Sequence, residues 1–350
     1  MKVATLFFCV IAVFLSSCTN DEPLLVSKAL PEGSLTQPRG LFVDDDKIVV
    51  VDGQPSSKVF LFNPKTLALT ATVDPIALAD KKFKLTPGQA IDLSTHADFL
   101  MLSCYSHLYK YNYRGNLISD HDIPPTSSEY AAFGDRLIRK NQVTENYVKY
   151  QTLELCDHDL GEVQEIVRVL APATRGDLDV LSHNLKYQIY RNRLYVSGRS
   201  DDFRIDVYDL TGALVDSISI EYERVVLEQD HKDQVYSYYE SHPAYRSGSF
   251  ELINSRLIFP ERLPAIKYFR IADDQICVMT YQQTFDSNEC VLLDLAGKIL
   301  ARAPVVFRAN NLMLPVPFSY YDGRIYQLIQ SRAANVWDLR SYKIVIEPIS

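Results

Sequence analysis

The sequence lacks the short motifs by which many enzymes are recognised. Neither a GxSxG nucleophile elbow, nor an HExxH zinc helix, nor a phosphate-binding glycine loop occurs in its 350 residues. No Lys/Arg-rich cluster is present, and the formal net charge is −8. A surface that binds phosphates needs clustered positive charge, so we expect no nucleic-acid partner. These absences favour a binding role over catalysis by a standard local motif.

The cysteines lack the spacing of a metal site. Six are present, and none belongs to a CxxC or Cys/His pattern, so neither a structural zinc site nor another cofactor is predicted. Most cysteines of the mature chain are expected to be buried free thiols. Cys277 and Cys290 are the candidate disulfide, because they lie on two runs that resemble neighbouring strands of one hairpin.

Positive charge followed by an apolar run marks the N-terminus. Lys2 precedes the run from Val3 to Leu15, which suits a signal-peptide core better than a membrane span of about 20 residues. The segment Leu15-Ser-Ser-Cys18 resembles the bacterial lipobox, whose cysteine receives a diacylglycerol and becomes the first mature residue. The alternative is an ordinary secretory signal with a chance cysteine.

The lipid on Cys18 is the only membrane anchor that the sequence predicts, because no later stretch reaches roughly 18 uninterrupted apolar residues. Residues 1–17 are then a lipoprotein signal peptide and residues 18–23 a lipidated tether. Asp21 and Glu22 resemble the acidic signal that directs some lipoproteins of Bacteroidota to the outer face of the outer membrane. We expect a protein anchored in the outer membrane, on its periplasmic or cell-surface side.

A three-residue pattern occurs six times in the remaining chain, residues 24–350. Each copy has a polar turn residue, one further residue, and an Ile or Leu that opens a strand-like run. Asp, Asn and Gly suit tight turns because they tolerate left-handed backbone or bond their own main chain. Each copy therefore predicts a hairpin turn before the second strand of a repeated unit. The copies begin at Asp46, Asp98, Asp135, Asn192, Asp274 and Gly323.

A second pattern follows five of these copies. An apolar or alternating run ends in Asn or Asp, and a turn and another strand-like run come next. Two hairpins repeated at about 40 to 55 residues are typical of the four-stranded blades of a β-propeller. The sequence therefore predicts an all-β fold, a six-bladed β-propeller. The five runs end at Asn63, Asn112, Asp157, Asp209 and Asp294.

An insertion is predicted between the fourth and fifth blades. Leu194 and Ile276, which open corresponding strands, are 82 residues apart, too far for one blade. We assign the excess to an insertion over about 225–262, with a helix at about 230–242 that stops before Pro243. A helix packed beside the ring is favoured over a ligand lid.

The last blade is expected to be completed by the N-terminus. Residues 342–346 form a good strand, but residues 331–340 depart from the pattern, so one strand is missing there. A propeller closes when a strand from one terminus completes the blade of the other, which removes open edges. Residues 24–30 are the natural candidate for that strand.

The lipobox at Cys18, the six degenerate Asp-x-Ile/Leu copies and the late helical insertion together resemble the TolB-like six-bladed propeller lipoproteins of Bacteroidota. The resemblance covers nearly the whole mature chain. It implies the propeller and the lipid anchor, and it brings no catalytic motif. Since propellers serve as binding platforms or as hydrolases, the fold alone does not choose a function.

Binding residues are expected on loops at one face of the ring. The loops that enter each blade's first strand and those between its second and third strands open on the same face, and such loops commonly bind ligands. The first set holds Arg39, Gln89, His183 and Asn184, and the second holds Gln54, His107, Asn141, Arg199, Gln283 and Arg332.

The leading hypothesis is a membrane-tethered module that binds an envelope protein, a peptide or a glycan through this face. One alternative is a metal-dependent, lactonase-like hydrolase, whose site would be built on the axis from single residues of different blades. Another is a purely structural subunit of an envelope complex. The acidic run Asp44 to Asp46 lacks the spaced glycine turn of a calcium loop, so we interpret it as a solvated hairpin turn.

Overall fold

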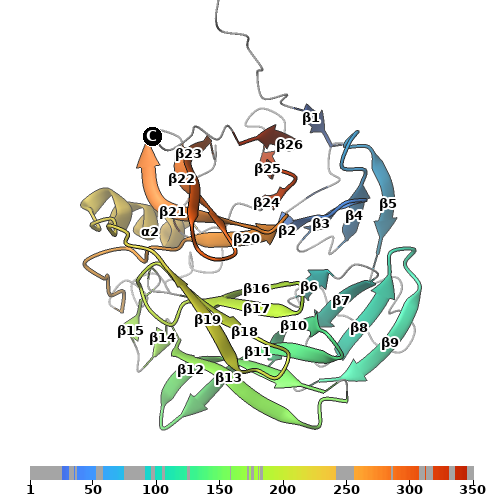
Figure 1. The fold of residues 1–350 in the computed structure, drawn as a ribbon, viewed down its shortest axis with the longest axis horizontal. Helices are drawn as coiled ribbons and strands as arrows, with labels where there is room; N and C mark the ends of the chain where they lie inside the picture. The colour runs from blue at the N-terminus through green and yellow to red at the C-terminus, as the bar shows by residue number, and fades with distance from the viewer. Residues whose placement is uncertain are drawn as a thin grey trace, which may run out of the picture.

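Six four-stranded antiparallel sheets are arranged around a central axis in the computed structural model (Figure 1). Each sheet is one blade, and the prediction of a six-bladed β-propeller is confirmed. The structure describes residues 26–30, 35, 38–52, 58–74, 91–95, 99–104, 107–123, 127–157, 159–171, 173–174, 177–179, 181, 184–241, 256–284, 287–306, 312, 318–330 and 336–344.

The strands follow the blades in chain order. The first three blades are β2 (Pro38–Val43), β3 (Ile48–Asp52), β4 (Val59–Phe62) and β5 (Leu69–Val73); β6 (Ile91–Thr95), β7 (Phe99–Cys104), β8 (His107–Asn112) and β9 (Leu117–Asp122); and β10 (Ser127–Phe133), β11 (Arg136–Glu145), β12 (Val148–Cys156) and β13 (Val163–Leu170). The last three are β16 (Lys186–Tyr190), β17 (Arg193–Ser197), β18 (Arg204–Tyr208) and β19 (Leu214–Ser219); β20 (Tyr268–Ala272), β21 (Gln275–Thr284), β22 (Ser287–Asp294) and β23 (Ile299–Val306); and β24 (Phe318–Tyr321), β25 (Arg324–Gln330), β26 (Trp337–Lys343) and β1 (Val26–Ala29). A short ribbon of β14 (Ala173–Thr174) and β15 (Asp177–Leu178) follows the third blade.

The repeated three-residue pattern marks the second strand of every blade, as predicted, with β3, β7, β11, β17, β21 and β25 starting at or next to its last residue. In three of the preceding turns both central residues have positive φ, as at Asp273 (52°) and Asp274 (59°). That is the type I′ geometry, which matches the twist of the flanking strands and favours Asn, Asp and Gly. The pattern is therefore a backbone requirement of tight turns. The other two pairs are Arg191–Asn192 and Asp322–Gly323.

The second repeated pattern marks the turn between the third and fourth strands. The side-chain oxygen of its Asn or Asp accepts hydrogen bonds from the backbone further on, as Asn112 Oδ1 does from the N–H groups of Arg114 (3.0 Å) and Asn116 (2.9 Å). Such bonds explain why a short polar residue ends the third strand. The same arrangement occurs at Asn63, Asp157, Asp209 and Asp294.

The N-terminal strand closes the ring. β1 pairs antiparallel with β26, with Val26 opposite Ser341 and Ala29 opposite Asp338, and the two strands lie side by side in Figure 1. The last blade thus takes three strands from the C-terminus and one from the N-terminus. The expected strand at 342–346 is only partly correct, because β26 begins at Trp337 and ends at Lys343. Asp338 and Arg340 interrupt the apolar pattern expected of a strand, so the sequence did not indicate the first part of β26.

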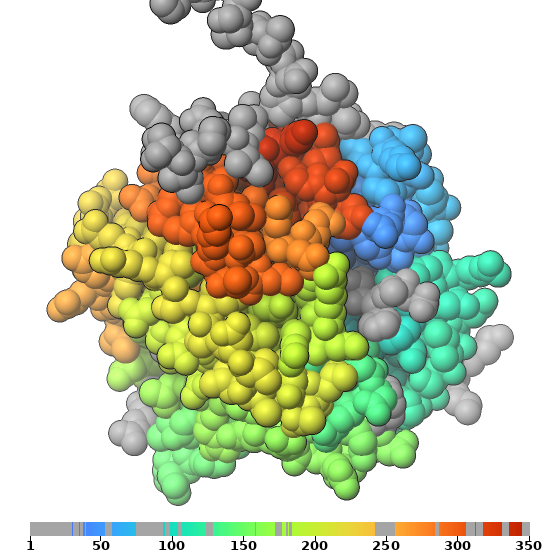
Figure 2. Space-filling model, in the orientation of Figure 1, coloured from blue at the N-terminus to red at the C-terminus, as the bar shows by residue number. Residues whose placement is uncertain are grey.

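A helix, α2 (Gln229–Ser241), follows the fourth blade, so the predicted insertion between blades four and five is confirmed. Val235 and Tyr239 are its buried residues, and they pack with Leu263 and Leu312, as expected of a helix packed beside the ring. The space-filling view shows the helix, in yellow, against the orange fifth blade (Figure 2). Within the described part of the chain, no helix has the length and apolar character that a membrane span requires.

The core is divided among the six contacts between neighbouring blades. Leu41, Ile48 and Phe60 of the first blade pack with Tyr326 and Leu328 of the last, for example. Five further apolar clusters join the other neighbouring pairs in the same way. Because burial of apolar area is the main source of stability, the ring depends on closure at every blade contact.

Candidate functional site

The strand directions define two ends of the ring. The turns between first and second strands and between third and fourth strands lie at one end, called here the hairpin end. The loops between second and third strands and the connections between blades lie at the opposite end, called here the loop end. α2 belongs to one of these connections. The loop end is therefore the face on which the candidate binding residues were expected from the sequence.

Part of the predicted set lies outside the described residues, namely Gln54, Gln89, His183 and Arg332, and so does the lipidation candidate Cys18. Arg39 is the second residue of β2, and its side chain is not described. Asn184 and Gln283 are exposed, before β16 and near the end of β21. None of the described members of the set lines the cavity on the axis of the ring. Their role in binding stays a prediction.

Two further members of the set contact carboxylates. His107 opens β8, and its Nδ1 lies 3.0 Å from Oδ1 of Asp122 at the end of the neighbouring strand β9. Asn141 lies on β11, where its Nδ2 donates to Oε1 of the buried Glu154 (3.3 Å). Each side chain is therefore held within its own blade, and the two residues belong to different blades.

Arg199 lies in the loop between β17 and β18. Its Nη1 donates to the hydroxyl of Tyr208 (3.2 Å) and to Oδ2 of Asp206 (3.4 Å). Asp206 is buried, and its other carboxylate oxygen accepts from Nε of Arg204 (2.8 Å). A buried carboxylate is costly unless a positive charge pairs with it. Arg199 therefore helps to stabilise the fourth blade, although its side chain is exposed at the surface.

A projecting hairpin in the third blade is the main feature of the loop end that sequence reasoning missed. β11 and β12 have ten and nine residues, whereas β3 and β4 of the first blade have five and four. The corresponding strands have six residues each in the second blade and five each in the fourth, so at about 3.3 Å per residue this hairpin extends beyond both neighbours. In the fifth blade, β21 and β22 are of similar length, with ten and eight residues. Its tip is the pair Asn146–Tyr147, and the Tyr147 side chain is 90% exposed.

The backbone at this tip suits Asn146 but is unfavourable for Tyr147. Asn146 and Tyr147 both have positive φ, 51° and 65°. A two-residue turn of this type prefers Gly at its second position, and a bulky residue there costs about 1 kcal/mol. Strained residues of this kind cluster at functional sites. A large amphipathic ring held out in solvent on an ordered hairpin is a typical anchor for a partner.

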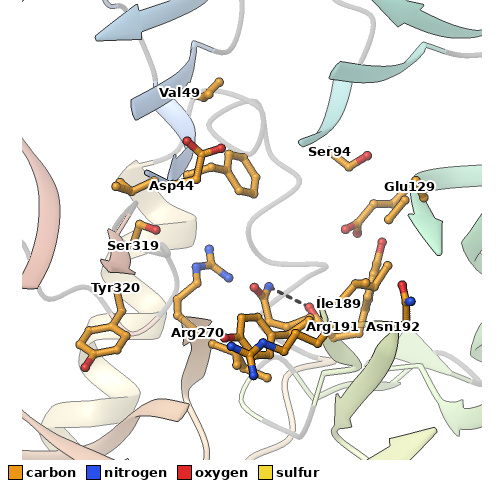
Figure 3. Close-up of a pocket in the computed structure, with 18 of the residues that line it drawn as sticks. Asp44, Val49, Ser94, Glu129, Ile189, Arg191, Asn192, Arg270, Ser319 and Tyr320 are labelled. Carbon is orange, nitrogen blue, oxygen red and sulfur yellow. Dashed lines mark hydrogen bonds between the residues drawn. The ribbon is translucent and has the colours of Figure 1, made fainter. Parts of the chain in front are cut away.

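A cavity of about 490 Å³ occupies the axis of the ring. The innermost strand of every blade contributes to its wall (Figure 3), and residues of the hairpin turns, among them Gly134 and Asn192, line it as well. Apolar side chains such as Phe42 and Ile189 line the cavity together with the polar residues Ser94 and Ser319. The cavity therefore opens toward the hairpin end, opposite the Tyr147 hairpin.

Arg270 on β20 is the principal positive group of the cavity wall. Its Nε donates to the carbonyl of Phe318 (3.2 Å) and its Nη1 to the carbonyl of Phe269 (3.4 Å). Burial lowers the pKa of Arg270 from its usual value, while Glu129 acts in the opposite direction. In Figure 3 Arg270 and Glu129 extend into the cavity from separate walls.

The carboxylates of the cavity wall come from two blades. Asp44 lies in the turn after β2 and is ion-paired with Lys47 (2.7 Å), and Glu129 on β10 lies 3.8 Å from Nζ of Lys140. Backbone N–H groups of Asp46 and Lys47 donate to Asp44 Oδ1, which agrees with the interpretation of this acidic run as a hairpin turn. In the described ranges, no three His, Cys, Asp or Glu residues are grouped closely enough to hold a metal ion.

Two lysines lie at the loop end of the inner strands. Lys186 opens β16 and donates from Nζ to the carbonyl of Ile266 (3.4 Å), and Lys267 directly precedes β20. Burial lowers the pKa of Lys267 to about 8. Burial, together with the charge of Lys140, lowers the pKa of Lys186 to about 8 as well. Both amines are therefore protonated less readily than that of an exposed lysine.

Comparison with known proteins supports the fold. No protein-family model and no curated protein matches the sequence. The structure is similar to that of a DUF4221 family member from Bacteroides vulgatus, with a TM-score of 0.52 and 10% identity over 92% of this chain and 98% of that one. At this identity the likeness indicates the fold alone.

Weaker likenesses carry no argument about function. One is to a chain of the mitotic checkpoint complex, with a TM-score of 0.45, 8% identity, and coverage of 93% of this chain and 96% of that one. Another is to BamB from Moraxella catarrhalis, with a TM-score of 0.31, 12% identity, and coverage of 86% and 71%. The function therefore has to be inferred from the site itself.

Proposed function

We propose that the protein is a lipid-anchored module of the outer membrane whose propeller binds an envelope protein, peptide or glycan at its loop end. The observation that carries the proposal is Tyr147, an exposed ring at the tip of a projecting, ordered hairpin. Loops on a rigid scaffold are common binding sites, and tyrosine is enriched among the residues that dominate binding energy. The resemblance to TolB-like lipoproteins agrees with this role.

The position of the closing strand supports the orientation. β1 begins opposite Ser341, toward the hairpin end, and runs toward the loop end. Val26 is eight residues after Cys18, so a fully extended chain can separate the two residues by about 28 Å at most. A lipid on Cys18 would therefore hold the hairpin end nearer to the bilayer. The Tyr147 hairpin would then point away from the membrane, toward a partner in the periplasm or outside the cell.

The anchor is tested by Cys18→Ala. One acylated terminus supplies the membrane affinity in this proposal, so the variant should lose its lipid and appear in the soluble fraction. Membrane fractionation, with the lipid measured by mass spectrometry, checks both effects. A variant that stays on the membrane without lipid would contradict the anchor, and it would leave the binding proposal to the next test.

The binding surface is tested by a matched pair, Tyr147→Gly and Asn146→Gly. Tyr147→Gly relieves a bulky residue with positive φ, so it should raise the free energy of unfolding by up to about 1 kcal/mol. Asn146→Gly should change it little, because Asn already suits the first position of this turn. Only Tyr147→Gly removes the exposed ring. Recovery of cross-linked partners from the protein's own membranes should fall several-fold for Tyr147→Gly and stay at the wild-type level for Asn146→Gly. Equal recovery by both variants would move the binding surface away from this hairpin.

A further inference from the structure

The central cavity contains a positive group that the fold itself does not neutralise. Lys47 and Arg191, the other cations of the cavity wall, are paired with carboxylates at 2.7 Å, with Asp44 and Asp274 respectively. Arg270 has no carboxylate within ion-pair distance among the described residues. Its two hydrogen bonds go to backbone carbonyls, and its Nη2 makes no further bond to a described residue.

A poorly solvated guanidinium with unused donors is costly to the fold unless something compensates it. The burial that lowers the pKa of Arg270 reflects this cost. Glu129, which faces it from β10, is half-buried, and its carboxylate lies 3.8 Å from Nζ of Lys140. The cavity therefore retains a positive site on the wall formed by blade five. A bound anion is the simplest way to satisfy it.

The remaining wall indicates what kind of anion fits. Phe42, Ile189 and Tyr187 provide apolar and aromatic surface, and the hydroxyls of Ser94 and Ser319 provide short polar contacts. A volume of about 490 Å³ lies in the range of sites that enclose small organic molecules. A bare inorganic ion would leave most of this space unfilled.

We propose that the central cavity binds a small organic anion, a carboxylate or phosphate attached to an aromatic or similarly sized apolar body, with Arg270 as its charge partner. The planar guanidinium offers paired N–H donors, which match the oxygens of either group. The apolar body lies against Phe42 and Ile189. Entry is from the hairpin end, where the turn residues line the cavity. This site is separate from the Tyr147 hairpin, so it does not depend on the proposed function.

The test uses two probes, benzoate and phenyl phosphate, with benzyl alcohol as the neutral counterpart. Their binding to the full mature chain in detergent is measured by titration calorimetry. The wild type should bind at least one of the anions, and Arg270→Gln should weaken that binding by about tenfold or more. Arg302→Gln is the matched control, because it removes an arginine of the same blade that is ion-paired with Glu289 (3.0 Å) and does not line the cavity, and it should bind like the wild type.

A second variant keeps the test decisive if Arg270→Gln does not fold. Glu129→Gln removes the negative charge that faces Arg270, so it should tighten anion binding several-fold and leave benzyl alcohol unaffected. Arg270→Lys should bind with intermediate affinity, because it keeps the charge and loses the paired donors. The proposal is overturned if neither anion binds the wild type, or if a folded Arg270→Gln binds as well as the wild type. It is also overturned if Glu129→Gln leaves anion affinity unchanged.

Discussion

The Sγ atom of Cys277 lies 2.9 Å from the Sγ atom of Cys290, on the adjacent strands β21 and β22 of the fifth blade. Both residues are buried, and in this structure both are free thiols. The register offsets them diagonally, with Cys290 opposite Met279. The neighbouring thiol and burial both raise the pKa of Cys290. The pair that the sequence proposed as a disulfide is thus brought together, although its oxidation stays a prediction.

We predict that Cys277 and Cys290 form a disulfide when the protein matures in an oxidising compartment. Each thiol would lose one hydrogen atom to a disulfide oxidant, which is itself reduced to two thiols. Intact-mass spectrometry of protein purified without reductant should show a mass lower by two hydrogen atoms. Cys277→Ser should abolish that difference, whereas Cys156→Ser should leave it in place. A wild type with both thiols free after export would contradict the prediction.

Ring closure should depend on Leu30, directly after β1. This side chain is 4% exposed and packs in the cluster between the last and first blades, and its N–H donates to the carbonyl of Trp337 (2.8 Å). Leu30→Ala should lower the free energy of unfolding by about 2 to 4 kcal/mol, because it leaves a cavity in this contact.

Leu69→Ala is the control for the closure experiment, because Leu69 is 46% exposed. Its effect should stay within about 0.5 kcal/mol. Chemical denaturation of both variants measures the difference. A Leu30→Ala variant as stable as Leu69→Ala would show that the closing strand contributes little to the fold.

The lowered pKa of Lys186 predicts a pH-dependent cost. The unfolded side chain binds its proton more tightly than the folded one, whose pKa is about 8. The charge therefore destabilises the fold below about pH 8, and this cost disappears as the pH rises toward the unfolded pKa. Lys186→Met should raise the free energy of unfolding at pH 7 by up to about 3 kcal/mol.

The same comparison at pH 10 separates charge from packing. There the Lys186 amine of the wild type is largely neutral, so the advantage of Lys186→Met should shrink. The difference between variant and wild type cancels the titration of the tyrosines that both share. Denaturant unfolding at the two pH values is the measurement. An advantage of the same size at both values would assign the effect to packing instead of charge.

The turns could be predicted from sequence because their requirements are local. Asp274 and Asn112 occur where a positive φ or a side-chain bond to the nearby backbone is needed, so a short pattern revealed them. The strand at Trp337–Lys343 was partly missed for the opposite reason. Its charged residues Asp338 and Arg340 are paired with each other at 3.0 Å, a contact that periodicity does not reveal.

The candidate sites could not be predicted in the same way. Arg270 and Glu129 are 141 positions apart in the sequence, and they share a cavity only because the inner strands of all six blades meet at the axis. Tyr147 had a local signal, since Asn146 and Tyr147 separate two runs that pair as one hairpin. What the sequence did not reveal was that these strands are longer than those of the first blade, which is what exposes the ring.

The most direct test of the account is photo-cross-linking in the living cell, with p-benzoylphenylalanine placed at position 147 or at position 117. Leu117 is the matched control, because it is exposed on the fourth strand of the second blade, at the hairpin end. Binding at the loop end predicts an adduct of defined mass from position 147 and none from position 117. The same adduct from position 117 alone, or from neither position, would contradict binding at the loop end.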